Sequence, residues 1–132
     1  MSAKFIDTNV ALYSMSEDQA KRRQALSILT CHPTLSLQVL NEAANVMRRK
    51  LGFDVRVISD VLKRWLHESQ LHPLSPSTLL SALEIGDRYG FSHYDSLIIA
   101  AALESRCTTL YSEDLQDGQV INNRLTVVNP FK

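Results

Sequence analysis

Hydrophobic and polar positions along the chain follow two alternating periods. Short runs of apolar, β-branched and aromatic residues predict strands at the start of the chain and at residues 108–111 and 125–128, and Thr34 to Ser36 is a short strand candidate. Between them, apolar residues recur every three or four positions, which predicts helices. Because strands that alternate with helices form parallel sheets, we expect a single α/β domain over residues 1–132. Its small central parallel β-sheet should be flanked by helices.

Capping residues mark the limits of the predicted helices. Ser16 and Gln19 form a capping-box pattern ahead of a helix that runs to Leu29. Gly52 should end the helix that begins at Gln38. The other helices are expected to begin near residue 9, after Asp54, after Ser75-Pro76 and after Ser92.

Two of these helices have apolar patterns that predict how they pack. The helix after Ser75-Pro76 should turn Leu79, Leu80 and Leu83 inward and end at Gly90. The helix over residues 95–103 is apolar nearly all round, so we expect it to be central and tightly packed.

Composition and cysteine usage limit the class of protein. At 132 residues and 45% hydrophobic content, the chain can bury a core without disulfides. Cys31 and Cys107 lie in apolar stretches, which predicts buried free thiols rather than a disulfide or a metal site. Lys4 interrupts the first apolar stretch, so no signal peptide is expected, and no apolar run approaches the ~20 residues of a membrane span. A cytoplasmic protein is therefore expected.

The charge balance is neutral, with 14 basic and 14 acidic residues. Neutrality alone argues against nucleic-acid binding. If several acids occupied one pocket, however, the remaining surface would be basic, and the clusters at residues 21–23, 48–50 and 63–64 could contact phosphates. The alternative is that these clusters are solvated helix faces.

Four acidic side chains lie at the ends or margins of predicted elements: Asp7, Glu42, Asp95 and Asp114. Asp7 follows the apolar residues Ala3, Phe5 and Ile6. The ends of parallel strands meet at one edge of a sheet, where open α/β folds bind ligands. Two unit charges ~4 Å apart repel by about 4 kcal/mol at an effective dielectric constant of ~20. A divalent cation among such carboxylates would remove that repulsion.

Each acid also has an ordinary explanation. Asp95 stands three residues after Ser92 and could complete a capping box. Glu42 belongs to a polar stripe at helical spacing, made of Gln38, Glu42, Asn45 and Arg49, and could pair with Arg49 or Asn45. Acidic turns after strands are common, and Asp117-Gly118 is typical of a turn. The combination of acids therefore carries more weight than any one of them.

The residue types restrict the chemistry of a site built from these acids. Ligand sets made only of oxygen favour Mg²⁺ or Mn²⁺ over zinc. Such an ion activates a water molecule and neutralises charge on a phosphoryl oxygen. The four histidines lack the helical i, i+4 pairing of a zinc site, and the sequence has no glycine-rich phosphate loop or nucleophile elbow. These features indicate metal-assisted phosphodiester hydrolysis.

Five segments carry a resemblance to a known family: Phe5-Ile6-Asp7-Thr8-Asn9, Val39-Leu40-Asn41-Glu42, Tyr94-Asp95-Ser96-Leu97-Ile98, Tyr111-Ser112-Glu113-Asp114-Leu115 and Val128-Asn129-Pro130-Phe131. In this order they resemble the motifs of the PIN domain family, and in particular its VapC-like toxins. The resemblance implies an Mg²⁺-dependent endoribonuclease, with Mn²⁺ as a possible substitute, that acts as the toxin of a type II toxin–antitoxin pair.

The resemblance also implies roles for individual residues and for partners. Four acids are expected to hold metal ions and act in catalysis: Asp7, Glu42, Asp95 and Asp114. Supporting hydrogen bonds are expected from Thr8, Asn9 and Ser112. Glu113, Asp114 and Asp117 compete for the fourth acidic position, and Asp117 is the main alternative to Asp114. The implied partners are an RNA substrate, a cognate antitoxin and a second copy of the chain in a homodimer. The apolar faces at residues 39–47 and 58–66 could form these protein contacts or pack in the core.

Two other functions remain open from the sequence. Asp7 could be a phosphorylated aspartate, as in haloacid-dehalogenase-like phosphatases or receiver domains. Those proteins usually need a second nearby acid and a lysine after a later strand, and residues 8–10 and 112–118 supply neither. A noncatalytic RNA- or protein-binding PIN-like module is the other alternative. It gives no reason to keep four mutually repelling carboxylates.

Overall fold

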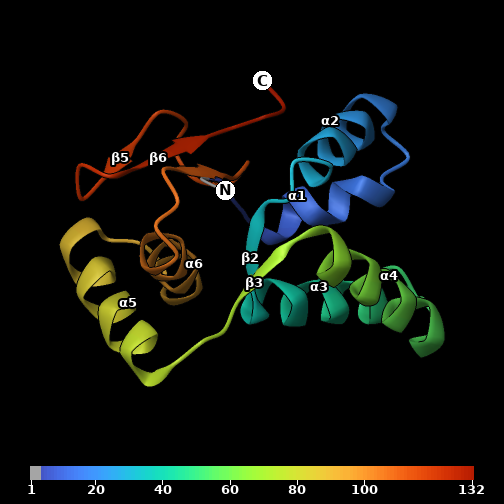
Figure 1. Ribbon diagram of the computed structural model, residues 1–132, viewed down its shortest axis with the longest axis horizontal. Coiled ribbons are helices and arrows are strands. Elements are labelled where there is room, and N and C mark those ends of the chain that lie inside the picture. Colours follow the sequence, from blue (N-terminus) through green and yellow to red (C-terminus); the bar gives the residue numbers. More distant parts are fainter. Residues whose placement is uncertain (1–3) are drawn as a thin grey trace.

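A computed structural model describes residues 4–132, which form a six-stranded sheet with helices on both sides (Figure 1). The strands are β1 (Lys4–Ile6), β2 (Thr34–Ser36), β3 (Gln70–His72), β4 (Thr109–Tyr111), β5 (Val120–Ile121) and β6 (Leu125–Val128). Their order is β3-β2-β1-β4-β6-β5, and every pairing is parallel except that of β5 with β6. The predicted α/β class with a mostly parallel central sheet is confirmed.

The helices form two groups, one on each side of the strands. They are α1 (Thr8–Leu12), the 3₁₀ helix η1 (Tyr13–Met15), α2 (Gln19–Leu29), α3 (Leu37–Arg49), α4 (Val55–Glu68), α5 (Pro76–Tyr89) and α6 (His93–Glu104). Helices α5 and α6 lie together on one side, whereas α1 to α4 lie on the other (Figure 1). β1 is therefore central, with β2 and β4 as its neighbours and helices over both faces.

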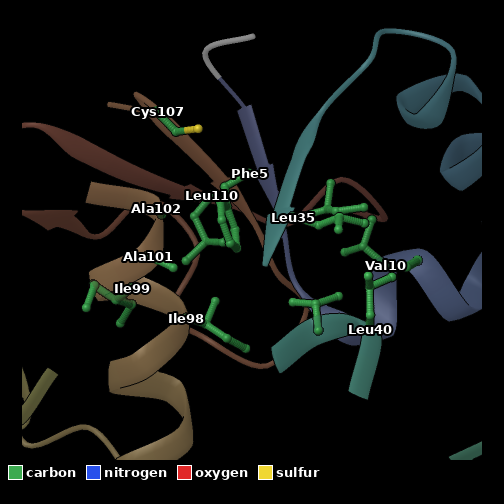
Figure 2. Close-up of a cluster of buried hydrophobic side chains, with 14 of the residues drawn as sticks. Phe5, Val10, Leu35, Leu40, Ile98, Ile99, Ala101, Ala102, Cys107 and Leu110 are labelled. Atoms are coloured by element: carbon green, nitrogen blue, oxygen red, sulfur yellow. The ribbon is translucent and has the colours of Figure 1, made fainter. Parts of the chain in front are cut away.

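The core is centred on α6, as its apolar sequence predicts. Ile99, Ala101 and Ala102 are fully buried, and Ile98 and Ala100 are nearly so. In Figure 2 the labelled side chains of α6 lie on one side of the strands that carry Phe5, Leu35 and Leu110, while Val10 of α1 and Leu40 of α3 lie on the other. The small alanines bring α6 close to the sheet, which places the start of this helix near the ends of the central strands.

The inward orientation predicted for the α5 leucines is wrong. Leu79, Leu80 and Leu83 are 43%, 63% and 54% exposed. The helix instead buries small and medium side chains, namely Thr78, Ala82 and Ile85. The physical reason is its close approach to α6: a methyl group added at Gly86 would lie 2.9 Å from the Ser96 hydroxyl oxygen. Leucines would not fit into this interface, so they occupy the outer face.

Two strands were not predicted because both are edge strands with weak patterns. β3 has no fully buried residue, and β5 is only two residues long. β5 reaches β6 through a tight turn in which Asn122 and Asn123 both have positive φ angles of 51° and 55°. Positive φ at two central residues is typical of a type I′ hairpin turn, and asparagine tolerates it better than most residues.

Smaller differences concern a helix cap, a cysteine and the first strand. Asp18 caps α2, because its carboxylate accepts hydrogen bonds from the backbone N–H groups of Ala20 and Lys21; the predicted Ser16–Gln19 capping box is therefore wrong. Cys107 is buried as predicted, whereas Cys31 is exposed; both are free thiols. Ala3, predicted to belong to the first strand, lies outside the described residues.

Within residues 4–132, no helix has both the length and the apolar character needed to cross a membrane.

Leu110 of β4 is buried whereas Leu80 of α5 is exposed, and this difference leads to a stability prediction. Leu110→Ala removes a fully buried side chain and should lower the free energy of unfolding by about 2–5 kcal/mol. Leu80→Ala removes an exposed leucine and should change it by no more than about 0.5 kcal/mol. Urea denaturation of both variants measures the difference. Equal losses of stability would contradict the assigned orientation of α5.

Candidate active site

Asp7 lies at the junction of β1 and α1 at the centre of the sheet edge. Its backbone N–H donates to the carbonyl of Tyr111 in β4 at 3.0 Å, which ties the end of β1 to the end of β4. The carboxylate caps α1 by accepting from the Thr8 N–H at 2.6 Å, and its second oxygen accepts from the Ser112 hydroxyl at 2.9 Å. The side chain is only 6% exposed. The structure thus holds both oxygens of this carboxylate in fixed directions.

Burial raises the pKa of the Asp7 carboxyl from 3.8 to about 6. The hydrogen bonds from Ser112 and Thr8 oppose this rise, but they are outweighed by the loss of hydration. The negative charges of Asp95 and Asp114 raise the pKa of Asp7 further. Asp7 therefore lies within electrostatic reach of both acids, as the convergence of element ends predicts.

Glu42 joins this group from α3. One carboxylate oxygen accepts from the Thr8 hydroxyl at 2.9 Å, and the other accepts from the Gln38 amide nitrogen at 2.7 Å. Thr8 therefore links the Asp7 carboxylate, through its backbone N–H, to the Glu42 carboxylate, through its hydroxyl. The alternative pairing of Glu42 with Arg49 or Asn45 is not present among residues 4–132.

Asp95 lies in the first turn of α6. Its backbone N–H donates to the Ser92 hydroxyl oxygen at 3.2 Å, so Ser92 caps the helix as predicted. The carboxylate does not complete the capping box, and it has no hydrogen-bond or ion-pair partner in the described part of the chain. It is thus available to a ligand.

Of the three acids that follow β4, Asp114 is the one connected to the start of α1. Its carboxylate accepts from the Asn9 amide nitrogen at 2.8 Å. Glu113 instead accepts from the Lys21 ammonium at 2.7 Å and from the Tyr13 hydroxyl. Tyr13 and Lys21 belong to η1 and α2, so Glu113 anchors the segment after β4 to the helices beside it.

Asp117 has a different role from Asp114. One carboxylate oxygen accepts from the Asn129 N–H at 2.8 Å, and the other lies 3.6 Å from the Lys132 ammonium. It therefore closes the turn before β5 onto the segment that follows β6. Neither contact involves Asp7, Glu42 or Asp95.

The donor set around Asp7 fits a hard divalent cation. None of the four acids Asp7, Glu42, Asp95 and Asp114 forms an ion pair with a lysine or arginine in residues 4–132. Their available donors are all oxygens, which suit Mg²⁺ or Mn²⁺. No three acidic, histidine or cysteine side chains of the described chain are close enough to hold an ion by themselves. Mg²⁺ usually keeps several waters and takes only one or two direct carboxylates.

The basic clusters are only partly free for phosphate contacts. Lys21 is paired with Glu113 and also lies 4.5 Å from the centre of the Tyr13 ring, and Arg64 pairs with Glu68. The remaining basic side chains of these clusters are exposed: Arg22, Arg23, Arg48, Arg49, Lys50 and Lys63.

Sequence reasoning did not assign a role to Gln38, which contacts Glu42 directly. The i, i+4 spacing of these two residues in the polar stripe of α3 was the available signal. It also missed the contact of Glu113 with Tyr13 and Lys21, which joins residues about 100 positions apart and leaves no local pattern.

Comparison with known proteins gives one family and several related folds. A model of the PIN domain matches residues 4–116. The structure is similar to a chain of a toxin–antitoxin complex from Klebsiella pneumoniae, with a TM-score of 0.69, 20% sequence identity, and 96% of this chain and 97% of that chain covered. No curated protein sequence matches the chain.

Two further solved structures share the fold. Mycobacterium tuberculosis VapC20, a sarcin-ricin loop cleaving toxin, has a TM-score of 0.68 and 19% identity, with 84% of this chain and 89% of that chain covered. A chain of VapBC2 from Rickettsia felis, bound to a DNA fragment from its promoter, has a TM-score of 0.62 and 18% identity, with 84% and 87% covered.

The raised pKa of Asp7 predicts a pH-dependent stability in metal-free buffer. A folded-state pKa of about 6 against 3.8 means that the folded protein binds this proton more tightly than the unfolded chain. The resulting stabilisation is complete below pH 3.8 and is lost as the pH rises through 6. Between pH 7 and pH 4.5 the wild type should gain about 2 kcal/mol relative to Asp7→Asn. Urea denaturation across this range provides the measurement, and a pH-independent difference would contradict the shift.

Proposed function

The chain belongs to the PIN domain family, and on that premise we propose that it is a Mg²⁺-dependent endoribonuclease and the toxin of a type II toxin–antitoxin pair. The observation that carries the proposal is the group of four carboxylates around the ends of β1 and β4, which includes a buried Asp7 and has no paired cation in residues 4–132. Similarity of fold to toxin–antitoxin proteins supports the assignment to a toxin.

We propose that Asp7, Glu42, Asp95 and Asp114 hold Mg²⁺, which Mn²⁺ can replace. When bound, the metal activates a water for attack on phosphorus and neutralises charge on the phosphoryl oxygens. The chain's own contribution is to orient the carboxylates. Supporting hydrogen bonds come from Thr8 to Asp7 and Glu42, from Ser112 to Asp7, and from Asn9 to Asp114. No side chain acts as a nucleophile in this scheme.

RNA is the proposed substrate. VapC20, whose fold is similar, cleaves the sarcin-ricin loop. The exposed basic residues of α2, α3 and α4 could contact the phosphates of an RNA strand, although the whole chain is neutral. We place this activity in the cytoplasm, where RNA and a co-expressed antitoxin would meet the enzyme.

A cognate antitoxin and a second copy of the chain are the proposed protein partners. Two of the similar folds come from toxin–antitoxin proteins solved with other components, as an intact complex and as a promoter-bound assembly. The apolar face of α3 is used inside the domain, because Val39 and Met47 are buried. α4 buries Ile58 and Trp65 but exposes Val55, Val57 and Leu66, so this helix keeps apolar surface for a partner.

The rival functions have less support from the site. A phosphorylated Asp7 would usually need a second nearby acid and a lysine after a later strand, and residues 8–10 and 112–118 supply neither. A noncatalytic binding module would have no use for a buried carboxylate next to other acids, since the ionised form is destabilised there.

The nuclease proposal predicts that two charge-removing variants lose cleavage. Asp7→Asn and Asp95→Asn should each reduce Mg²⁺-dependent cleavage of RNA at least ~100-fold, because each removes a preorganised charge from the site. Asp60→Asn makes the same change at an exposed position of α4 that has no contact with the site, and it should cleave normally. Cleavage of total RNA by the purified proteins, with and without EDTA, tests this. Wild-type protein that leaves RNA intact with Mg²⁺ and Mn²⁺ would refute the proposal.

The fourth acid has its own test. Asp114→Asn should lose most metal-dependent cleavage, because its carboxylate is held by Asn9 beside Asp7. Asp117→Asn should retain cleavage and lose at most ~1 kcal/mol of stability, because that side chain closes a turn. Cleavage rates and urea midpoints of the two variants separate the roles. An inactive Asp117→Asn together with an active Asp114→Asn would assign the fourth position to Asp117 instead.

A further inference from the structure

Gln38 is a buried amide that bridges two parts of the candidate site. Its side chain is 6% exposed, near the beginning of α3. The amide nitrogen donates to a carboxylate oxygen of Glu42 at 2.7 Å and to the backbone carbonyl of Tyr94 at 3.1 Å. Tyr94 immediately precedes Asp95 in α6, so one side chain connects a site acid of α3 to the residue next to a site acid of α6.

The orientation of this amide follows from its neighbours. A carboxylate and a backbone carbonyl are both acceptors only. Rotating the amide by 180° would place its oxygen against both of them, so the nitrogen must face Glu42 and Tyr94. The amide oxygen of Gln38 is then buried without a hydrogen-bond partner in the described residues.

In the described residues, no second hydrogen bond joins α3 to α6. α3 and α6 lie on opposite sides of the central strands (Figure 1), and within residues 4–132 the contact from Gln38 to Tyr94 is the only hydrogen bond that joins them. Glu42 is fixed on its other side by Thr8. The position of the Glu42 carboxylate relative to the start of α6 therefore depends on one amide group.

The unpartnered oxygen shows that this amide is poorly explained by stability alone. A buried acceptor without a partner costs about 1–3 kcal/mol. A methionine has a similar length and carries no such acceptor, so it would fill the same space without that cost. It would also remove the two hydrogen bonds that the amide donates, each worth about 0.5–1.5 kcal/mol, so the amide adds little net stability. Residues that lower stability at a site are expected where function requires them.

We propose that Gln38 is a positioning residue of the metal site, which acts by holding the Glu42 carboxylate at a fixed separation from Asp95. The proposal rests on the function proposed above, since it assumes that these two acids bind the same metal centre. Gln38 itself does not need to touch the metal. Groups that orient metal ligands by hydrogen bonds typically change metal affinity 10- to 100-fold when removed.

The test compares Gln38→Met with Gln24→Met. Gln24 is exposed on α2 and its side chain forms no hydrogen bond in the described chain, so it controls for the chemical change itself. Mn²⁺ titration followed by electron paramagnetic resonance gives the metal affinity, and urea denaturation without metal gives the stability. Gln38→Met should bind Mn²⁺ about 10- to 100-fold more weakly. Its urea midpoint should stay close to that of the wild type, because the two lost hydrogen bonds and the removed unpartnered oxygen offset one another. Gln24→Met should match the wild type in affinity.

Several results would overturn the positioning role. One is an unchanged Mn²⁺ affinity in Gln38→Met when the wild type binds the ion, and another is a loss of affinity accompanied by an equal loss of stability. Gln38→Leu serves as a second variant if methionine packs badly. In a Glu42→Gln background, the Gln38 substitution should have no further effect on affinity, because the amide acts through that carboxylate; an additive loss would also overturn the proposal. If the wild type itself binds no Mn²⁺, the metal site of the proposed function fails as well.

Discussion

A carboxylate buried at the end of the central strand is the feature on which the arrangement of the site depends. Asp7 follows β1 directly, so the same residue ends a strand and caps a helix. Its burial makes the ionised form unfavourable, and the N–H of Thr8 and the hydroxyl of Ser112 offset only part of that cost. The elements that supply those donors, α1 and the segment after β4, must therefore stay in place around it. A conflict between burial and charge thus specifies the local structure.

The segment after β4 shows how distant parts of the chain meet this requirement. Glu113 is held by Tyr13 and Lys21, while its neighbour Asp114 is held by Asn9. Glu113 is thereby fixed to η1 and α2, whereas Asp114 is fixed to α1 beside the buried carboxylate. Because the contacts come from η1, α2 and α1, the geometry of the acidic group depends on how these helices pack against the sheet.

Much of the fold could be predicted from periodicity, and the exceptions have physical causes. The strands β1, β4 and β6 and the central α6 have clear apolar patterns, whereas β5 is only two residues long and β3, like β2, has one apolar residue between two polar ones. The apolar pattern of α5 predicts that its leucines face inward, but the spacing between α5 and α6 admits only small groups at Gly86. Hydrophobicity along a helix cannot reveal that limit.

The candidate site was likewise only partly predictable from the sequence. Acids at the ends of elements could be found from sequence because strand and helix ends are locally encoded. Which of Glu113, Asp114 and Asp117 faces the buried carboxylate depends on partners up to 105 residues away, and the contact of Gln38 with Tyr94 depends on how α6 packs relative to α3.

The close contact of α5 with α6 has a further consequence for how the chain can vary. A methyl group at residue 86 would push the Ser96 hydroxyl off the Ser92 carbonyl, to which it donates at 2.7 Å. Residues 86 and 96 are therefore expected to covary across homologues. The substitutions permitted at residue 86 of α5 then depend on residue 96 of α6, which is adjacent to Asp95.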